Sequence, residues 1–432
     1  MNVVKNGILE YTKTNRRAFH SFPEKAWMEY ITVTFISTQL TNLSFDIKRG
    51  EEIMDMSSAM GLPSEHENSE AFNRALEFVS AAELTKFENN KTAVAGLLDL
   101  DKEKTVCIRF DMDALPIKES SDISHIPYKE GFCSRMEGVM HSCGHDMHSA
   151  LGLGLARLIS ENKDKLSVNV LILFQPAEEG VRGAASIVSS GILNDVDYIL
   201  SSHVWSNMPL GKIVCSQNGT SSTHKLDVIF KGKSAHAGIC PEKGNNALLA
   251  AANSVVRLHD LIGQFDDIVR VNVGKMESGT ARNIIADYSK IELELRCKNL
   301  DTELILLEKS VSIIEKSAEE QLCSFEIIKQ GEAFGAKGSL DLSMLIKESA
   351  LEIEFFNDII LDDEENRGCE DFTSMMNFVM SNGGKACFIG IGASLKDKNF
   401  THHTSDFDIS EEIIAPILEL YLNIIQKISR CG

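Results

Sequence analysis

The chain has 432 residues, of which 43% are hydrophobic and 25% are charged, and its formal net charge is −20 at pH 7. These values are typical of a soluble globular protein with a sizeable core and two or three domains. So negative a charge disfavours nucleic acid and anionic membranes as partners, although it says little about small substrates.

The ten cysteines are scattered without the close spacing of a disulfide framework, which favours free thiols in a reducing compartment. The N-terminal segment has no apolar core of signal-peptide length, and no later stretch approaches the length of a membrane span. We therefore expect a cytoplasmic protein that does not cross a membrane.

The first part of the chain is predicted to be helical over residues 3–43. Within it, His20 is interpreted as a structural or rim histidine rather than a ligand. Residues 44–93 are charged and rich in methionine, and the spacing of apolar residues around 71–84 predicts an inserted helical segment. No motif in this segment indicates a function.

A β-rich run over 104–110 is followed at once by two acids, Asp111 and Asp113. In extended geometry these two side chains share one face of the strand. Ligands of open α/β sheets gather at the carboxyl ends of strands, so the acids are candidates for a site. A solvated loop with two acids explains this stretch equally well.

The densest group of metal-ligand residue types lies at 140–150, in the sequence MHSCGHDMHSA. Gly144 lets the backbone turn so that Cys143 and His145 can converge on one position. Thiolate and imidazole suit zinc or a neighbouring transition metal. An apolar stripe of helical spacing follows at 151–158, which places the two candidate ligands on a loop that enters a buried helix. A redox thiol or a polar loop with chance histidines is the alternative.

A nearly continuous apolar run over 168–174 has the character of a central parallel strand, and Glu178 and Glu179 follow it. One carboxylate of such a pair can ligate a metal while its neighbour acts as a general base toward water.

Two more apolar runs lead to histidines. His203 follows the run at 198–200, where a core histidine is the alternative, and His402 and His403 follow a late strand over 387–392. Separate strand ends thus supply Asp, Cys/His, Glu/Glu, His and His. This convergence favours a metal site in the crevice of an α/β fold with a doubly wound, mostly parallel sheet.

Between about 220 and 335 the pattern changes to the order β-α-β-β-α-β, which is that of a ferredoxin-like unit. Its clearest strand, 285–297, alternates apolar and charged side chains, as a half-buried antiparallel strand does. We therefore predict a catalytic metal-binding domain over 1–220 and 335–432, with a small α+β domain inserted at 221–334.

Four motifs, HSCGHDMHSA, FQPAEEG, GKSAHAG and HHTSDFD, resemble those of the M20 metallopeptidases. Within that family they are similar to the amidohydrolase branch, which contains hippurate hydrolases and auxin-conjugate hydrolases, over nearly the whole chain. The stretches SDISHIPYKEGF and VNVGKMESGTARN resemble the aminobenzoyl-glutamate hydrolases of the family more closely still. The resemblance implies that the inserted domain serves in dimerisation and as a lid.

The resemblance also implies two divalent metal ions per subunit, manganese or zinc. Alignment on Phe407 and Asp408 favours His403 over His402 as the last ligand. Glu178 matches the general base, and Asp113 is assigned to orienting a ligand histidine. The ligand set implied in this way comprises Cys143, as a bridging thiolate, with His145, Glu179, His203 and His403.

In the small domain, His236 matches a histidine that in the family reaches into the partner's site, where it stabilises the tetrahedral oxyanion. A loop histidine that caps a turn is the alternative. Asn283 and Arg296 match family positions that hold the carboxylate or carbonyl of the substrate. For Arg296, an ion pair with Glu292 or Glu294 on its own strand is the alternative.

We therefore expect metal-dependent hydrolysis of the amide of an N-acyl or N-aroyl amino acid, with N-(4-aminobenzoyl)glutamate as the leading substrate. The subunit is expected to pair with itself or with a related second subunit. Trp205 stands where relatives carry smaller residues, which leaves the acyl group open. The alternatives are a deacylase of other N-acyl amino acids, a dipeptidase, or a non-catalytic small-molecule-binding protein on the same fold.

Overall fold

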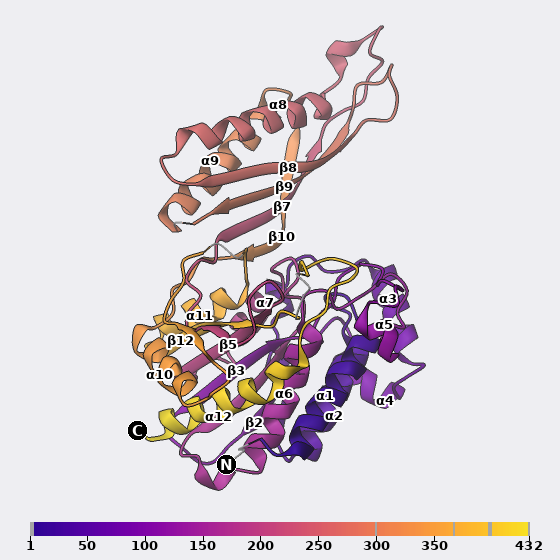
Figure 1. Cartoon of the computed structure of the whole chain (residues 1–432). Helices are drawn as coiled ribbons and strands as arrows, with labels where there is room; N and C mark the ends of the chain where they lie inside the picture. The colour runs from indigo at the N-terminus through magenta and orange to yellow at the C-terminus, as the bar shows by residue number, and fades with distance from the viewer. Residues whose placement is uncertain (1–3, 299, 366–367, 396–399, 431–432) are drawn as a thin grey trace. The chain divides into compact units, whose positions relative to one another are not determined.

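The computed structural model describes residues 4–298, 300–365, 368–395 and 400–430. They form two compact units (Figure 1). The larger unit contains Met1–Asn218, Ala336–Glu365 and Asp371–Gly432, and the smaller unit contains Gly219–Gly335 and Asn366–Glu370. The roles expected for the two domains, catalysis and dimerisation, stay predictions.

The larger unit is built on an eight-stranded mixed sheet with the strand order β1-β2-β4-β3-β5-β12-β6-β11. Its four central strands run parallel, and they are β4 (Asn169–Gln175), β3 (Thr105–Asp111), β5 (Tyr198–Trp205) and β12 (Lys385–Gly392). The edges contain antiparallel pairs and are formed by β1 (Asp46–Arg49), β2 (Val94–Leu98), β6 (Lys212–Val214) and β11 (Asp358–Ile360). The predicted mostly parallel, doubly wound sheet is confirmed.

Helices cover both faces of this sheet (Figure 1). Alternate residues of β4 enter two different cores: Val170 and Ile172 pack on one face, while Leu171 and Leu173 pack on the other. The first face is covered by α1 (Asn6–Ser21), α2 (Tyr30–Asn42), α6 (His145–Ser160), α10 (Leu340–Leu351) and α12 (Ile414–Arg430), and the second by α7 (Ala184–Ser190) and α11 (Phe372–Ser381).

The segment 44–93 contains helices, as predicted, but it also supplies the edge strand β1. Its helices are α3 (Glu65–Ala75) and α4 (Ala81–Leu84). At the start of α3, Ser64 and Glu67 form a reciprocal capping box, which satisfies two backbone N–H groups that the helix leaves unpaired. The strand was not predicted, because its four residues, DIKR, show no run of apolar residues.

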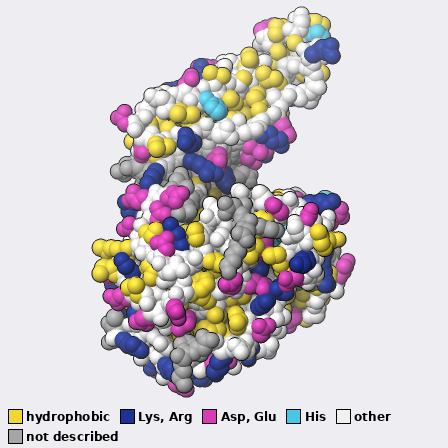
Figure 2. All heavy atoms as spheres, in the orientation of Figure 1, with side chains coloured by type: hydrophobic (Ala, Val, Ile, Leu, Met, Phe, Trp, Pro, Cys, Tyr) yellow, Lys and Arg dark blue, Asp and Glu magenta, His cyan; other side chains and the backbone are white. Residues whose placement is uncertain are grey.

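The smaller unit has the predicted ferredoxin-like order of elements. They are β7 (Ser222–Lys231), α8 (Ala247–His259), β8 (Val269–Ser278), β9 (Tyr288–Cys297), α9 (Leu300–Glu319) and β10 (Ser324–Ala333). The sheet order is β10-β7-β9-β8, and all neighbouring strands are antiparallel. Figure 2 shows hydrophobic side chains on the helical surface of this unit, where Leu248, Leu249 and Val256 of α8 are exposed.

No helix in the described parts of the chain is both long and apolar enough to cross a lipid bilayer.

Candidate metal centre

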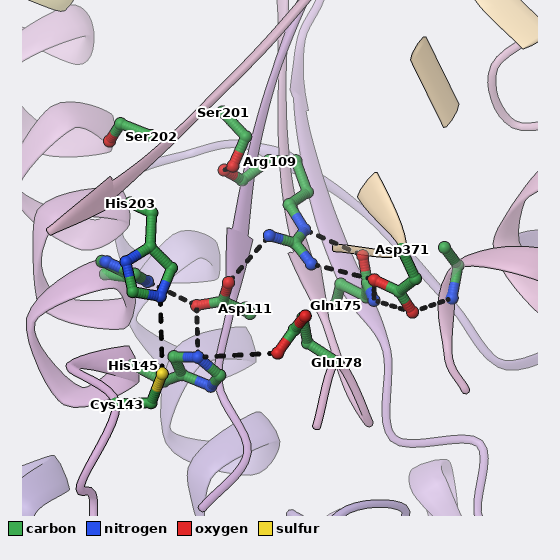
Figure 3. Close-up of polar contacts among 12 residues, drawn as sticks. Arg109, Asp111, Cys143, His145, Gln175, Glu178, Ser201, Ser202, His203 and Asp371 are labelled. Carbon is green, nitrogen blue, oxygen red and sulfur yellow. Dashed lines mark hydrogen bonds and ion pairs between the residues drawn. The ribbon is translucent and has the colours of Figure 1, made fainter. Parts of the chain in front are cut away.

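Potential metal ligands from separate segments meet where the central strands of the larger unit end (Figure 3). Asp111 is the last residue of β3, and His203 lies near the end of β5. Cys143 precedes α6, and His145 is its first residue. Because the parallel strands end at the same edge of the sheet, residues distant in sequence become neighbours here.

Cys143 lies at the centre of the group. Its Sγ is 3.5 Å from His203 Nε2 and 3.6 Å from His402 Nδ1. Cys143 also forms a group with Glu179 and His403 in which all ligand atoms lie within 4.8 Å of one another. A third such group joins Glu179 to His145 and Glu178. The structure thus brings together the five predicted ligands and the predicted base, while the role of each residue stays a prediction.

Gly144 allows the turn that presents Cys143 and His145. Its φ is +93°, and a Cβ at this position would lie 2.7 Å from Cγ2 of Val204. An L-residue would therefore meet both backbone strain and a steric clash. The required glycine agrees with the turn expected from the sequence.

The rings of His145 and His203 are held so that Nε2 of each faces the group. His145 Nδ1 donates to the carbonyl oxygen of Asp113 at 2.9 Å, and His203 Nδ1 donates to that of Val204 at 2.9 Å. A neutral imidazole with its proton on Nδ1 offers the Nε2 lone pair to a metal. The outer bonds therefore fix the tautomer that metal binding needs.

Two buried polar atoms of the group have no hydrogen bond, although native proteins rarely leave such atoms unsatisfied. They are His145 Nε2 and Glu179 Oε1, and the latter lies 3.3 Å from His403 Nε2 without hydrogen-bond geometry. Together with the thiol of Cys143, these atoms have the chemistry of a site for divalent transition metals. The residues present therefore fit the metal ions that the sequence motifs imply.

Asp113 positions both glutamates. Its Oδ1 accepts the backbone N–H of Glu178 at 3.1 Å, and its Oδ2 accepts that of Glu179 at 2.9 Å. Asp113 also contacts His145 Nδ1 at 3.3 Å. One carboxylate therefore fixes the positions of the two glutamates relative to His145. Glu178 Oε2 then lies 3.8 Å from His145 Nε2.

The adjacent histidines 402 and 403 take different positions. His403 has a left-handed backbone, φ +63°, which turns its ring toward Glu179, whereas His402 faces Cys143 and His203. The Nε2 atom of His402 accepts the backbone N–H of Ser206 at 3.2 Å. The neutral ring of His402 therefore carries its proton on Nδ1 and presents N–H rather than a lone pair to Cys143.

The charges in this region shift the acidity of its members. Burial and the neighbouring His148 and His402 lower the pKa of His203 well below its usual value. Burial also lowers the pKa of His402, to about 3. By contrast, the contacts with Cys143 and Glu179 raise the pKa of His403 to about 10. His203 and His402 are thus neutral at physiological pH in the metal-free chain.

A buried polar network beneath the site was missed in the sequence. Asp111 accepts a 2.6 Å bond from His148 Nδ1, whose Nε2 accepts the N–H of Val204. Arg109 Nη1 donates to Asp111 at 2.7 Å, and Arg109 Nη2 lies 3.3 Å from Asp371 (Figure 3). Despite burial, the neighbouring rings of His145 and His148 and the charge of Arg109 hold the pKa of Asp111 well below its usual value. The available signal was an arginine inside an apolar strand, which must find a buried partner.

The remaining predicted residues belong to the smaller unit. His236 is exposed, and its Nδ1 accepts the N–H of Gly238 at 3.1 Å. The carbonyl oxygen of Asn283 accepts the N–H of Ala237 at 3.0 Å, so the segments of His236 and Asn283 are neighbours. Arg296 Nη2 donates to Glu294 at 2.9 Å, which is the ion pair considered as the alternative. The substrate-binding roles of these residues stay predictions.

Comparison with known proteins relates this geometry to a family. The model of peptidase family M20/M25/M40 matches residues 107–427. The chain is 36% identical over 430 residues to a homolog of one p-aminobenzoyl-glutamate hydrolase subunit from Haemophilus influenzae, covering 99% of this chain and 100% of that protein. It is also 36% identical to the indole-3-acetyl-aspartic acid hydrolase of Enterobacter agglomerans, covering 94% of this chain and 92% of that protein.

Among solved structures, an aminobenzoyl-glutamate utilization protein from Klebsiella pneumoniae is similar over 98% of this chain and 96% of its own. The TM-score is 0.84 and the sequence identity is 29%.

Proposed function

The chain belongs to peptidase family M20/M25/M40 and is a metal-dependent amidohydrolase, and from this premise we propose that it cleaves N-(4-aminobenzoyl)glutamate to 4-aminobenzoate and glutamate. The family membership confirms the resemblance inferred from the four sequence motifs. The observation that carries the proposal is the group around Cys143, in which Glu178 and Glu179 lie beside buried ring nitrogens.

The substrate class is supported by what the two relatives named above have in common. One is named for an aminobenzoyl-glutamate and the other for an indole-3-acetyl-aspartate, and the chain is 36% identical to each. Both compounds join an aromatic acyl group to an amino acid with a second carboxylate. We therefore propose an aromatic acyl pocket and a site for an acidic amino acid, to which Asn283 and Arg296 contribute.

We propose that two divalent metal ions, manganese or zinc, are held by the five ligands predicted from the sequence. When bound, such ions lower the pKa of water and polarise the amide carbonyl. A thiolate ligand from Cys143 would favour zinc modestly. We keep His403 as the last ligand, because the ring of His402 presents a proton to Cys143.

The residues of the chain have separate roles in the proposed reaction. Glu178 takes the proton of the attacking water and delivers it to the leaving nitrogen of glutamate. Asp113 positions Glu178 through its backbone N–H and orients His145 through its ring N–H. His236, from a partner subunit, donates a hydrogen bond to the oxyanion that forms on the former carbonyl.

We further propose that the chain works as a dimer with itself or as a heteromer with a related second subunit, since two of its relatives are named as one subunit of a hydrolase. The exposed apolar side chains of α8 offer a surface for such pairing. A cytoplasmic location agrees with the cysteines, since none of the nine described ones forms a disulfide.

The test is release of the free amino acid (glutamate, aspartate or glycine, according to the substrate) by the purified chain, measured after chelation and after manganese or zinc is added back. The substrates are N-(4-aminobenzoyl)glutamate, indole-3-acetyl-aspartate, hippurate and N-acetylglutamate. We expect metal-dependent release that is fastest with the aminobenzoyl compound. The matched control is Glu178→Gln, which should keep its metal and lose turnover by at least about a hundredfold.

A preference for indole-3-acetyl-aspartate would support the proposed amide hydrolysis but would show that the acyl group of the substrate is indole-3-acetyl rather than 4-aminobenzoyl. Equal rates on N-acetylglutamate would contradict the aromatic pocket. Full activity of Glu178→Gln would contradict the assignment of the base.

A further inference from the structure

A second cluster of metal-ligand side chains lies in the larger unit and takes no part in the centre described above. Glu119, His125 and Cys133 offer one ligand atom each, and these atoms lie within 4.8 Å of one another. His20 of α1 joins them: its Nε2 and that of His125 both lie 2.8 Å from Oε1 of Glu119. The side chains of His20, His125 and Glu119 are 1%, 1% and 5% exposed.

The cluster forms because a loop docks against the end of α1. The N–H of Arg135 donates to the carbonyl oxygen of Ser21 at 2.9 Å, and Ser21 Oγ donates to that of Phe132 at 3.0 Å. These two bonds hold the segment that contains Cys133 against the end of α1, the helix that carries His20. His125 is the N-cap residue of the short helix α5 (Ile126–Glu130), which orients its ring toward Glu119.

The outer nitrogen of His20 is also held. Its Nδ1 lies 2.9 Å from Oδ2 of Asp146, which in turn accepts a 3.2 Å bond from Arg16 Nε. A carboxylate behind an imidazole is the arrangement that fixes the tautomer and direction of metal-binding histidines. It directs Nε2 of His20 into the cluster.

From this convergence we propose that Cys133, His125, Glu119 and His20 bind a zinc ion, separate from the metal ions of the proposed active site. One thiolate, two imidazoles and one carboxylate are a ligand set that zinc accepts in tetrahedral sites. His20 is 99 positions from Glu119 in the sequence, so an ion here ties the end of α1 to the loops on either side of α5. Its role is structural, and it goes beyond the proposed function.

A cavity lies beside the cluster. His125 lines a cavity of about 610 Å³ together with Ser120, Ser124 and the carboxylates of Asp122 and Asp406. Two carboxylates among the lining residues favour a cation over an anion.

The proposal competes with a metal-free explanation. In it, Glu119 is an ionised carboxylate that accepts hydrogen bonds from His20, His125, Cys133 and the N–H of Ser134. Burial opposes ionisation, but these bonds hold the pKa of Glu119 at about 2. The two explanations differ in metal content and in the reactivity of the thiol, which gives two tests.

The first test counts zinc by mass spectrometry in full-length protein that has been loaded and desalted. It uses a background with Cys143→Ala and Glu179→Ala, which lacks two of the proposed active-site ligands. Adding Cys133→Ser and His125→Asn should remove one further zinc per chain, whereas adding Cys240→Ser, at a partly buried cysteine elsewhere, should remove none. An unchanged count on adding the first pair overturns the proposal. The comparison does not depend on how many ions the active site holds.

The second test needs no substitution and so does not depend on whether the variants fold. Cys133 and Cys240 are both partly exposed, and alkylation of each can be followed by peptide mass mapping. Zinc should slow alkylation of Cys133 by at least about tenfold, because the coordinated thiolate is no longer available as a nucleophile. Alkylation of Cys240 should not change. Equal rates for Cys133 with and without saturating zinc would contradict the site.

Discussion

Asp113 connects three groups that the proposed reaction needs in fixed positions. It accepts the N–H groups of Glu178 and Glu179 and lies behind His145. Asp113→Asn replaces one acceptor oxygen by an NH₂ group, which must face one of these donors. We expect metal affinity to fall about 10- to 100-fold, as for other residues that hold metal ligands. Competition with a chelator measures this.

The matched control for that substitution is Asp164→Asn in an exposed turn, which should leave metal affinity unchanged. Affinity retained in Asp113→Asn would show that the carboxylate does not position the ligands.

The histidine pair gives a second prediction at the scale of single residues. His403→Asn should lose metal, because the proposed ligand is gone. His402→Asn should keep most of it, because an amide N–H can replace the Nδ1–H that faces Cys143. Metal content per chain, measured on both variants prepared in parallel, decides the matter. The reverse result would move the ligand role to His402.

At the scale of elements, Gly144 marks the entry to α6. Gly144→Ala must adopt φ +93° with its Cβ 2.7 Å from Val204, so we expect a loss of a few kcal/mol in the free energy of unfolding. Gly138 is a matched control: its φ is +71°, but nothing lies within 4 Å of a Cβ there, so Gly138→Ala should lose about 1 kcal/mol. Urea unfolding of both variants measures the difference, and equal losses would exclude the clash.

The elements of the smaller unit are joined by a buried ion triad. His224 of β7 lies 2.8 Å from Glu303 of α9 and 3.0 Å from Glu332 of β10. Lys329 also pairs with Glu332, and the ring of Phe334 packs on His224. Although burial opposes it, the ion pairs with the two glutamates raise the pKa of His224 to about 9.

The sign of the resulting pH dependence follows from this shift. Because the pKa is raised on folding, the stabilisation is complete below about pH 6.5 and is lost as pH rises to about 9. Its size is on the order of 3 kcal/mol. His224→Gln does not titrate and should lack this fall. Hydrogen exchange in β7 and β10 is compared between the wild type and His224→Gln at each pH. This comparison separates the contribution of His224 from that of His20, whose pKa lies in the same range. A pH-independent difference would contradict the triad.

An element or residue could be predicted from the sequence when the signal for it is local, and could not when it depends on a contact with a residue far away in the sequence. The apolar runs of β3, β4, β5 and β12 were predicted, and with them the strand ends that carry the site, because burial on both faces leaves a local signal. Arg109 was missed since Asp371, its partner, is 262 positions away. His20 was expected to be structural or at a rim. It is buried between Glu119 and Asp146, two contacts that only the folded chain creates.

At the scale of the whole molecule, the position of the proton on His236 bears on assembly. Its Nδ1 accepts the N–H of Gly238, so the neutral ring carries its proton on Nε2. In the alternative role, His236 caps a turn through Nδ1. This role leaves the Nε2–H of the exposed ring free to donate a hydrogen bond, as stabilisation of an oxyanion requires. The two roles of His236 are therefore compatible.

If His236 acts in the site of its partner, two inactive variants should complement each other. In a mixed dimer of Glu178→Ala and His236→Ala, one of the two sites has both an intact base and an intact donor. Random mixing yields half mixed dimers, so roughly a quarter of wild-type activity should return. The measurement is the aminobenzoyl-glutamate assay after dissociation and reassociation of equal amounts, with each variant mixed with itself as the control. No recovery, with exchange of subunits verified by mass spectrometry, would place His236 in the site of its own subunit or outside catalysis.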